Sequence, residues 1–264
     1  VQNGEPVFHG RPQCLQPVTW TDGWPMIGKD IDNDGIGEPV WIHDKPIESD
    51  ASLLLQTSDE FDKGSIGPQW NWNHEPRTER FSLTANPGQL RLIASKPIAA
   101  KRPRLKGAFW GAPNTLSQRQ IGIGKTQVET VLDLTGVEPG LRAGICHFSG
   151  SFSGYEGQFA VFGVRAEPTG RRVIFFADSK SSRTGQVLES DIVFLRSDTD
   201  FDQATFSWSP DGETWHRTDF QYQLRFGNWR GNRPGIVCWN PKTDDPAEAG
   251  YVDIDWFRYT PSER

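Results

Sequence analysis

Several features that would place a protein in a particular class are scarce in this 264-residue sequence. No apolar run approaches the ~20 residues that a membrane-spanning helix needs. Lys and Arg number 28 against 34 Asp and Glu, which gives a net charge of −6, whereas nucleic-acid binding requires a basic face that neutralises phosphates. Neither a membrane nor nucleic acid is therefore expected as a partner.

Cysteine is also scarce, and its spacing excludes two further classes. Cys14, Cys146 and Cys238 are far apart and form no CxxC pair, which argues against a zinc site and against a disulfide scaffold. Cys146 and Cys238 lie in apolar segments, where we expect buried thiols. The chain starts at Val1, which suggests a processed or cut N-terminus, and we expect a secreted or periplasmic protein.

The sequence also lacks a long 3.6-residue apolar period, the signature of an amphipathic helix. It contains instead many short alternating or aromatic-rich segments, such as QLRLIAS at 89–95, TQVETVLDL at 126–134 and YVDIDWFRY at 251–259. Turn pairs such as Asp22-Gly23 and Asp211-Gly212 separate these segments. Many short strands divided by turns predict an all-β sandwich or barrel.

The character of the sequence changes twice along the chain. Residues 1–47 contain a hairpin pattern, QPVTWTDGWPMIG, followed by an acidic loop and a proline-containing exit. Residues 48–57 are predicted to be a linker. A continuous β-domain is predicted over residues 58–260.

Motifs in both regions resemble one family of proteins. HGRPQCLQPVTWTDGWPMIG with DGIGEPV resembles the end of the catalytic propeller of family-43 glycoside hydrolases, the β-xylosidases, α-L-arabinofuranosidases and relatives. SDEFD, GAPNTLSQRQIG, FSWSPDGETW and GYVDIDWFRY resemble the C-terminal sandwich that many of them carry. The resemblance covers nearly the whole chain. It implies a concanavalin-A-like (jelly-roll) antiparallel β-sandwich preceded by a short remnant of a five-bladed β-propeller.

The same resemblance shows which part of the family's machinery has no counterpart here. Family members are inverting hydrolases, in which a base activates water and an acid protonates the leaving group. Five blades of ~40–50 residues need ~200 residues or more, and only residues 1–47 precede the predicted sandwich. The catalytic carboxylates lie on earlier blades and match no position in this sequence. We therefore assign no catalytic residue and expect no hydrolysis by this chain alone.

Two substrate-binding residues are implied within residues 1–47. Arg11 matches the arginine near the end of the family propeller that contacts substrate, a role suited to the fixed fork of a guanidinium. His9 lies in the region where family members place a histidine near the central channel. An arginine that pairs with an acidic neighbour is the alternative for Arg11.

Other substrate-binding candidates lie in two loops of the predicted sandwich. In the family, a sandwich loop reaches over the active site and lends an aromatic ring that can stack on sugar. AFWGAPNTL at 108–116 matches that loop, so Phe109 or Trp110 is the candidate. The alternative is that both rings are core, which we favour for Phe109. Arg119 follows as a hydrogen-bonding candidate that could equally hold the loop in shape. Trp229 is an aromatic candidate within NWRGNRPG, with core packing as the alternative.

The resemblance also implies a structural Ca²⁺ near the ends of the sandwich. Its ligands would be hard oxygens, and Asp255, with Glu60 or Asp59, is the expected set. Ordinary surface charge on edge strands is the alternative.

A second acidic segment, KDIDNDGIGEP at 29–39, begins like a calcium loop. Asp30, Asp32 and Asp34 alternate before a glycine, but the twelfth position counted from Asp30 is Trp41, where an EF-hand requires Glu. The EF-hand is thus excluded. We favour a surface turn, and a looser Ca²⁺ turn stays open.

Three functions are consistent with these features. The chain could be the C-terminal portion of a hydrolase of xylan- or arabinan-type glycans, with an upstream propeller chain or fragment as its partner. It could instead be a stand-alone module that binds xylo- or arabino-oligosaccharides, or a purely structural cap for a propeller.

Overall fold

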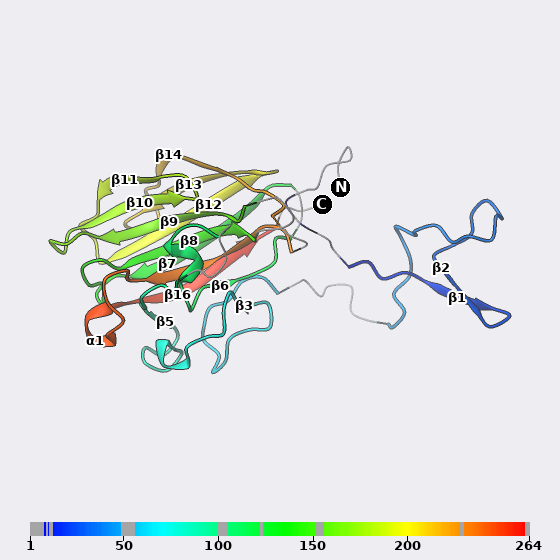
Figure 1. Ribbon diagram of the computed structural model, residues 1–264, viewed down its shortest axis with the longest axis horizontal. Coiled ribbons are helices and arrows are strands. Elements are labelled where there is room, and N and C mark those ends of the chain that lie inside the picture. The colour runs from blue at the N-terminus through cyan, green and yellow to red at the C-terminus, as the bar shows by residue number, and fades with distance from the viewer. Residues whose placement is uncertain are drawn as a thin grey trace. The chain divides into compact units, whose positions relative to one another are not determined.

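The computed structural model describes residues 8, 10, 13–48, 56–99, 105–121, 124–150, 156–227 and 230–261. Contacts divide the chain into two compact units. One unit consists of Val1–Arg11 with Gln56–Arg264, and the other is Pro12–Leu55. The elements of each unit are labelled in Figure 1.

The smaller unit is built on a β-hairpin. Strands β1 (Val18–Thr21) and β2 (Trp24–Ile27) pair antiparallel. Asp22 and Gly23 connect them with φ values of 51° and 82°, as a type I′ turn requires at both central positions. A bridge between Lys29 and Glu38 then closes the acidic loop.

The larger unit is a β-sandwich of two sheets, which Figure 1 shows face to face. In the described residues the first sheet has the order β11-β10-β9-β8-β15-β6-β3, and every pairing is antiparallel. Its strands are β3 (Asn71–Trp72), β6 (Leu116–Ser117), β8 (Arg142–Ser149), β9 (Gln158–Ala166), β10 (Arg172–Asp178), β11 (Ser182–Val187) and β15 (Arg233–Trp239).

The second sheet has the order β14-β13-β12-β7-β16-β5-β4 in the same part of the chain, and it is also antiparallel. Its strands are β4 (Phe81–Ser82), β5 (Leu90–Ile93), β7 (Thr126–Asp133), β12 (Ile192–Asp200), β13 (Gln203–Ser209), β14 (His216–Gln223) and β16 (Tyr251–Thr260). Helix is limited to η1 (Thr78–Arg80), η2 (Ala108–Gly111) and α1 (Pro246–Ala249) among the described residues.

The main core lies between the two sheets and follows the period-2 alternation of the strands. In β12, Val193 and Leu195 are buried while Arg196 faces outward. In β5, Leu90 and Leu92 are buried in the same way. The predicted all-β antiparallel sandwich is confirmed.

The first sheet also carries a second apolar layer on its outer face. Ile145 in β8 packs in the main core, and the adjacent Cys146 belongs to a separate cluster. We call this separate group the outer-face cluster: Phe109, Trp110, Ala112, Cys146, Phe148, Phe159, Val161, Phe175, Ala177, Val237 and Trp239. Because η2 and its flanking residues supply part of the cluster, the central strands of this sheet are buried on both faces.

The two thiols expected in the core are there. Cys146 and Cys238 are free and buried, and burial raises the pKa of each thiol. None of the helices among the described residues has the length and apolarity to span a bilayer.

The division of the chain differs from the predicted boundary at its start. Phe8, which falls in the predicted propeller remnant, is buried in the main core of the sandwich. Its ring meets Phe201 edge-on at 5.6 Å, and its carbonyl accepts a hydrogen bond from the Asn232 amide. An apolar side chain in contact with the core joins that unit regardless of its position in the sequence.

Candidate functional site

The loop expected to offer an aromatic ring folds that ring onto the sandwich instead. Phe109 stacks on Phe159 at 4.7 Å, and Trp110 meets Phe148 edge-on at 5.8 Å. The two residues are 1% and 5% exposed. Phe109 therefore packs in the core, the alternative favoured for it. Trp110, the other candidate to contact a sugar, is buried as well, because the apolar outer face of the first sheet draws both rings inward.

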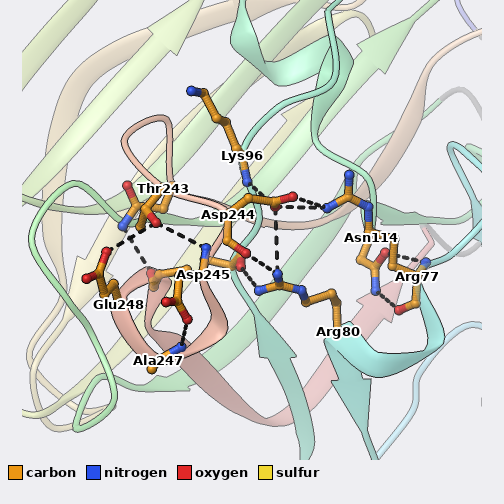
Figure 2. Close-up of polar contacts among 12 residues, drawn as sticks. Arg77, Arg80, Lys96, Asn114, Thr243, Asp244, Asp245, Ala247 and Glu248 are labelled. Atoms are coloured by element: carbon orange, nitrogen blue, oxygen red, sulfur yellow. Dashed lines mark hydrogen bonds and ion pairs between the residues drawn. The ribbon is translucent and has the colours of Figure 1, made fainter.

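A polar network fixes the base of this loop. Asn114 accepts a hydrogen bond from the Arg77 amide at 3.0 Å and donates to the Arg77 carbonyl at 2.9 Å. Arg77 donates in turn to both carboxylate oxygens of Asp244, at 2.8 and 3.0 Å. Asp244 also accepts a hydrogen bond from the Lys96 backbone amide at 3.1 Å. Figure 2 shows this contact. Segments far apart in the sequence are thus tied together around one carboxylate.

Asp244 is held in its charged form by these contacts. Burial tends to raise the pKa of its carboxyl, but the hydrogen bonds from Lys96 and Arg77, with the charges of Arg77 and Arg80, outweigh burial and lower the pKa. Arg80 also donates to the Asp244 and Ala94 carbonyls, as Figure 2 shows for Asp244. The network therefore positions the loop, and Arg77 serves it through its Nη1 group, which donates to both Asp244 oxygens.

Helix α1 completes this corner of the sandwich. The Asp245 side chain accepts a hydrogen bond from the Ala247 amide at 3.0 Å, which caps the first turn. Thr243 accepts from the Asp245 amide and lies 3.4 Å from a Glu248 oxygen. These bonds fix the backbone on which Asp244 stands (Figure 2).

Arg119 lies with two further arginines that the sequence reasoning missed. Burial first, and then the charges of Arg230 and Arg119, lower the pKa of Arg233 to about 10. Arg233 donates to the Ser117 hydroxyl at 3.0 Å. Neither Arg119 nor Arg233 forms an ion pair with a described carboxylate. The positive charges of Arg119 and Arg230 thus act on Arg233, and a substrate-binding role for Arg119 stays a prediction.

The signal for this arginine cluster was present in the sequence. NWRGNRPG carries Arg230 and Arg233 three residues apart, but only the pairing of β15 with β6 brings them to the Arg119 loop. The expected substrate-binding residues His9, Arg11 and Trp229 lie outside the described residues.

The three expected calcium ligands are not brought together. Asp59 is buried and accepts hydrogen bonds from the Phe61 amide at 3.0 Å and from Trp70 Nε1 at 2.8 Å. Glu60 pairs with Arg258 through both oxygens, at 3.0 and 3.1 Å. Asp255 is exposed. Protein donors already occupy Asp59 and Glu60, and the three carboxylates do not form a close group among the described residues, so the arrangement does not fit a common Ca²⁺ site.

The acidic loop of the smaller unit groups carboxylate oxygens, the ligands that a hard cation prefers. Oxygens of Asp30, Asp32 and Asp34 lie within 4.8 Å of one another, the one such group among the described residues. The Gly35 amide donates to Asp30 at 2.9 Å and the Ile36 amide to Asp34 at 2.7 Å. The loop's own amides thus close it as a turn, and Ca²⁺ binding there stays a prediction.

A buried polar cluster between the sheets was not anticipated from the sequence. His147 Nε2 lies 2.8 Å from the Ser197 hydroxyl, and Asn232 Nδ2 lies 3.2 Å from both His147 Nδ1 and Gln120 Oε1. Burial lowers the pKa of His147 to about 4. A neutral imidazole that donates through Nε2 and accepts at Nδ1 satisfies these contacts.

Comparison with known proteins identifies the fold. Residues 58–260 match the family described as the beta-xylosidase C-terminal concanavalin A-like domain. The chain belongs to this family. The family covers the whole sandwich and includes both the Asp244 network and the arginine cluster.

Individual relatives agree with this assignment. A beta-xylosidase of Formosa agariphila is 39% identical over 98% of this chain and 44% of its own length. A crystal structure of the GH43 protein BlXynB from Bacillus licheniformis has a TM-score of 0.74 at 22% identity, over 98% of this chain and 48% of that one. A bifunctional GH43-CE protein of Bacteroides eggerthii has a TM-score of 0.70. The chain spans about half the length of the Formosa agariphila beta-xylosidase and of the Bacillus licheniformis GH43 protein.

Proposed function

We propose that the chain is the C-terminal portion of a family-43 glycoside hydrolase that acts on xylan- or arabinan-type glycans by inversion. In this proposal the sandwich shapes the substrate pocket of a catalytic propeller on a longer protein or a partner chain. Residues 13–48 form the end of the last blade. The sandwich contributes no acid or base, so the reaction itself belongs to the propeller.

The observation that carries the proposal is the apolar surface of the smaller unit. Trp20, Trp24 and Trp41 are 68%, 79% and 90% exposed. Ile27 and Ile42 are exposed as well. Large apolar side chains gathered on so short a segment mark an interaction surface, and a two-stranded hairpin is marginal by itself. Neighbouring blades would cover these side chains and pair the free strand edges.

The related proteins support the same proposal. The beta-xylosidase of Formosa agariphila and a Bacteroides ovatus protein named a non-reducing end alpha-L-arabinofuranosidase both match parts of this chain. Both are longer than this chain, which covers 44% of the first and 16% of the second. We infer a secreted or periplasmic location, since polymeric glycans lie outside the cell.

A stand-alone carbohydrate-binding module is less well supported. Such a module would present aromatic rings to the sugar, but no tryptophan is exposed among the described residues of the sandwich. Titration with xylo- and arabino-oligosaccharides tests this alternative. Binding by this chain alone would favour it, and absence of binding leaves the hydrolase portion or the structural cap.

The proposed function is tested with a protein that carries the upstream coding sequence. We expect that protein to release p-nitrophenol from p-nitrophenyl β-D-xyloside or α-L-arabinofuranoside, while this chain alone releases none. NMR of the first sugar product would show the inverted anomer. A longer protein that is folded but inactive on both substrates would contradict the proposal and favour the structural cap.

A further inference from the structure

A pocket of about 260 Å³ lies at one end of the first sheet. Its lining includes Arg142, Arg165, Glu167, Pro168, Pro241 and Lys242. These residues come from the beginning of β8, from the end of β9 and the turn after it, and from the segment that follows β15. None of them belongs to the Asp244 network or to the arginine cluster.

Strand register explains why two of the cations meet. Arg142 in β8 lies directly opposite Arg165 in β9 and opposite Trp239 in β15. Directly opposed residues project from the same face of a sheet, and Trp239 belongs to the outer-face cluster. The Arg142 guanidinium lies 5.8 Å from the centre of the Trp239 ring, within the outer range of a cation–π contact.

The pocket has more positive charge than its own carboxylate can satisfy. Glu167 already pairs with Arg171 at 2.7 Å and approaches Arg165 at 3.6 Å. Arg142 and Lys242 form no ion pair with any described carboxylate. Among the described residues, these two cations of the pocket therefore have no counter-ion.

Arg142 is the cation of the pocket whose charge is least well compensated. Its Nε is buried and has no hydrogen-bond partner in the part of the chain that the structure describes. Burial, and then the charge of Arg165, lower the pKa of Arg142. A partly desolvated guanidinium is costly for the protein, and an anion that meets its terminal nitrogens from the pocket would supply a counter-charge.

We propose that this pocket binds the carboxylate of a single uronic acid unit. Arg142, Arg165 and Lys242 hold the carboxylate, since a guanidinium fork matches its two oxygens. Pro168 and Pro241 offer an apolar wall to the sugar ring. Drug-sized ligands need pockets of ~300–1,000 Å³, so this smaller pocket suits one sugar unit. The anion preference rests on the pocket alone, and the choice of a sugar rests on the proposed function.

The test compares three small ligands on this chain. Methyl β-D-glucuronide, methyl β-D-glucoside and inorganic phosphate are titrated and followed by NMR at low ionic strength. We expect the glucuronide to bind, the glucoside to bind at least 10-fold more weakly, and added salt to weaken the glucuronide. Equal binding of the two sugars, or binding of phosphate without the glucuronide, would overturn the proposal.

Three variants locate the binding. Arg142→Met keeps an aliphatic stem over Trp239 but removes the charge, and we expect at least ~10-fold weaker glucuronide binding, the factor typical of one lost charge-assisted hydrogen bond. Lys242→Met alters an exposed side chain, so it tests the pocket even if the Arg142 variant misfolds, and it should also weaken binding. Arg196→Met is the matched control, because Arg196 also stacks on a tryptophan, Trp215, but has Glu129 as its partner.

Unchanged affinity in both Arg142→Met and Lys242→Met would reject the pocket. The outcome is independent of the proposed function. A longer protein could hydrolyse the neutral xyloside normally while the pocket binds nothing, or the pocket could bind the glucuronide while that protein proves inactive.

Discussion

Single buried side chains decide how the aromatic loop of the sandwich behaves. Trp110 contacts Phe109, Phe148 and Phe159, and its Nε1 is buried with no hydrogen-bond partner among the described residues. Its ring also lies close to Gly157, where a Cβ atom would come within 2.8 Å of it. A side chain this enclosed contributes to stability whatever a longer protein does with the loop.

We expect Trp110→Ala to lower the free energy of unfolding by about 3–5 kcal/mol, the usual cost of deleting a buried aromatic ring. The loss corresponds to a Tm lower by roughly 10 °C in a domain of this size. Trp110→Phe should lose much less, because the ring is kept and no hydrogen bond is broken. Trp24→Ala, at an exposed position, is the control and should cost less than ~0.5 kcal/mol. A Trp110→Ala protein with unchanged Tm would show that the ring is not core.

His147 gives the sandwich a specific dependence on pH. Its folded pKa of about 4 lies below the ~6.5 of an unfolded histidine. Between these values the unfolded chain binds a proton that the folded chain does not bind. The contribution to stability is therefore complete above pH ~6.5 and falls as the pH is lowered towards 4.

Denaturant titrations at several pH values check this expectation. Between pH 7 and pH 4.5, the wild type should lose about 2–3 kcal/mol more than His147→Gln, which cannot take up that proton. His43→Gln removes an exposed histidine of the smaller unit and should keep the wild-type slope. If His147→Gln retains the wild-type slope as well, the buried imidazole is not the group responsible.

At the scale of strands, the sequence predicts where apolar and polar residues alternate. It does not predict which sheet faces are covered by other parts of the chain. β5 and β12 alternate as expected because one face meets the core and the other meets solvent. β8 is buried at seven successive positions, Ala143–Ser149. Its second covering layer comes from the η2 loop, which is distant in sequence, and that is why Trp110 could not be assigned to the core from its neighbours.

The sites show the same limit of sequence reasoning. Arg119 is a candidate from its loop alone, but Arg233 comes near it only through the β15–β6 pairing. Asp59 and Glu60 have the right chemistry for Ca²⁺, but Trp70 and Arg258 occupy their oxygens. Two residues far apart in the sequence meet only if their strands pair in a particular register. The alternation of apolar and polar residues within each strand does not specify that register.

The Asp244 network connects η1, the segment after β5 and the segment after β15. Asp244→Asn keeps the size of the side chain but removes the charge that Arg77 and Arg80 face. The Asp244 side chain is half exposed, so solvent weakens the ion pair, and we expect a loss of about 1 kcal/mol. Because the pKa of Asp244 is lowered in the fold, the difference from wild type should be present above pH ~4 and shrink as the pH falls further.

Hydrogen exchange separates this effect from a general loss of stability. Amides of residues 77–80 and 94–97 should exchange faster in Asp244→Asn, while those of β7 and β12 change only with global stability. Asp191→Asn breaks an exposed pair with Arg172 and serves as the control. Uniform acceleration across the sandwich would contradict a local bracing role.

At the scale of the whole molecule, the two units differ in how their apolar residues are covered. The sandwich buries its large side chains in two clusters, whereas the described residues of the smaller unit leave most of theirs exposed. A hairpin stabilised by a few strand bonds opens readily. In this chain alone, amides of β1 and β2 should exchange orders of magnitude faster than those of β7 and β16.

The same amides distinguish a blade remnant from an autonomous hairpin. In a protein that includes the upstream coding sequence, neighbouring strands would pair the hairpin edges and cover Trp20 and Trp24, so exchange of β1 and β2 should slow to the rate of the sandwich core. The β7 amides provide the internal control, since their burial is complete without the added residues. Rapid exchange of β1 and β2 in the longer, folded protein would mean that no blade covers them, and the propeller assignment of residues 13–48 would fail.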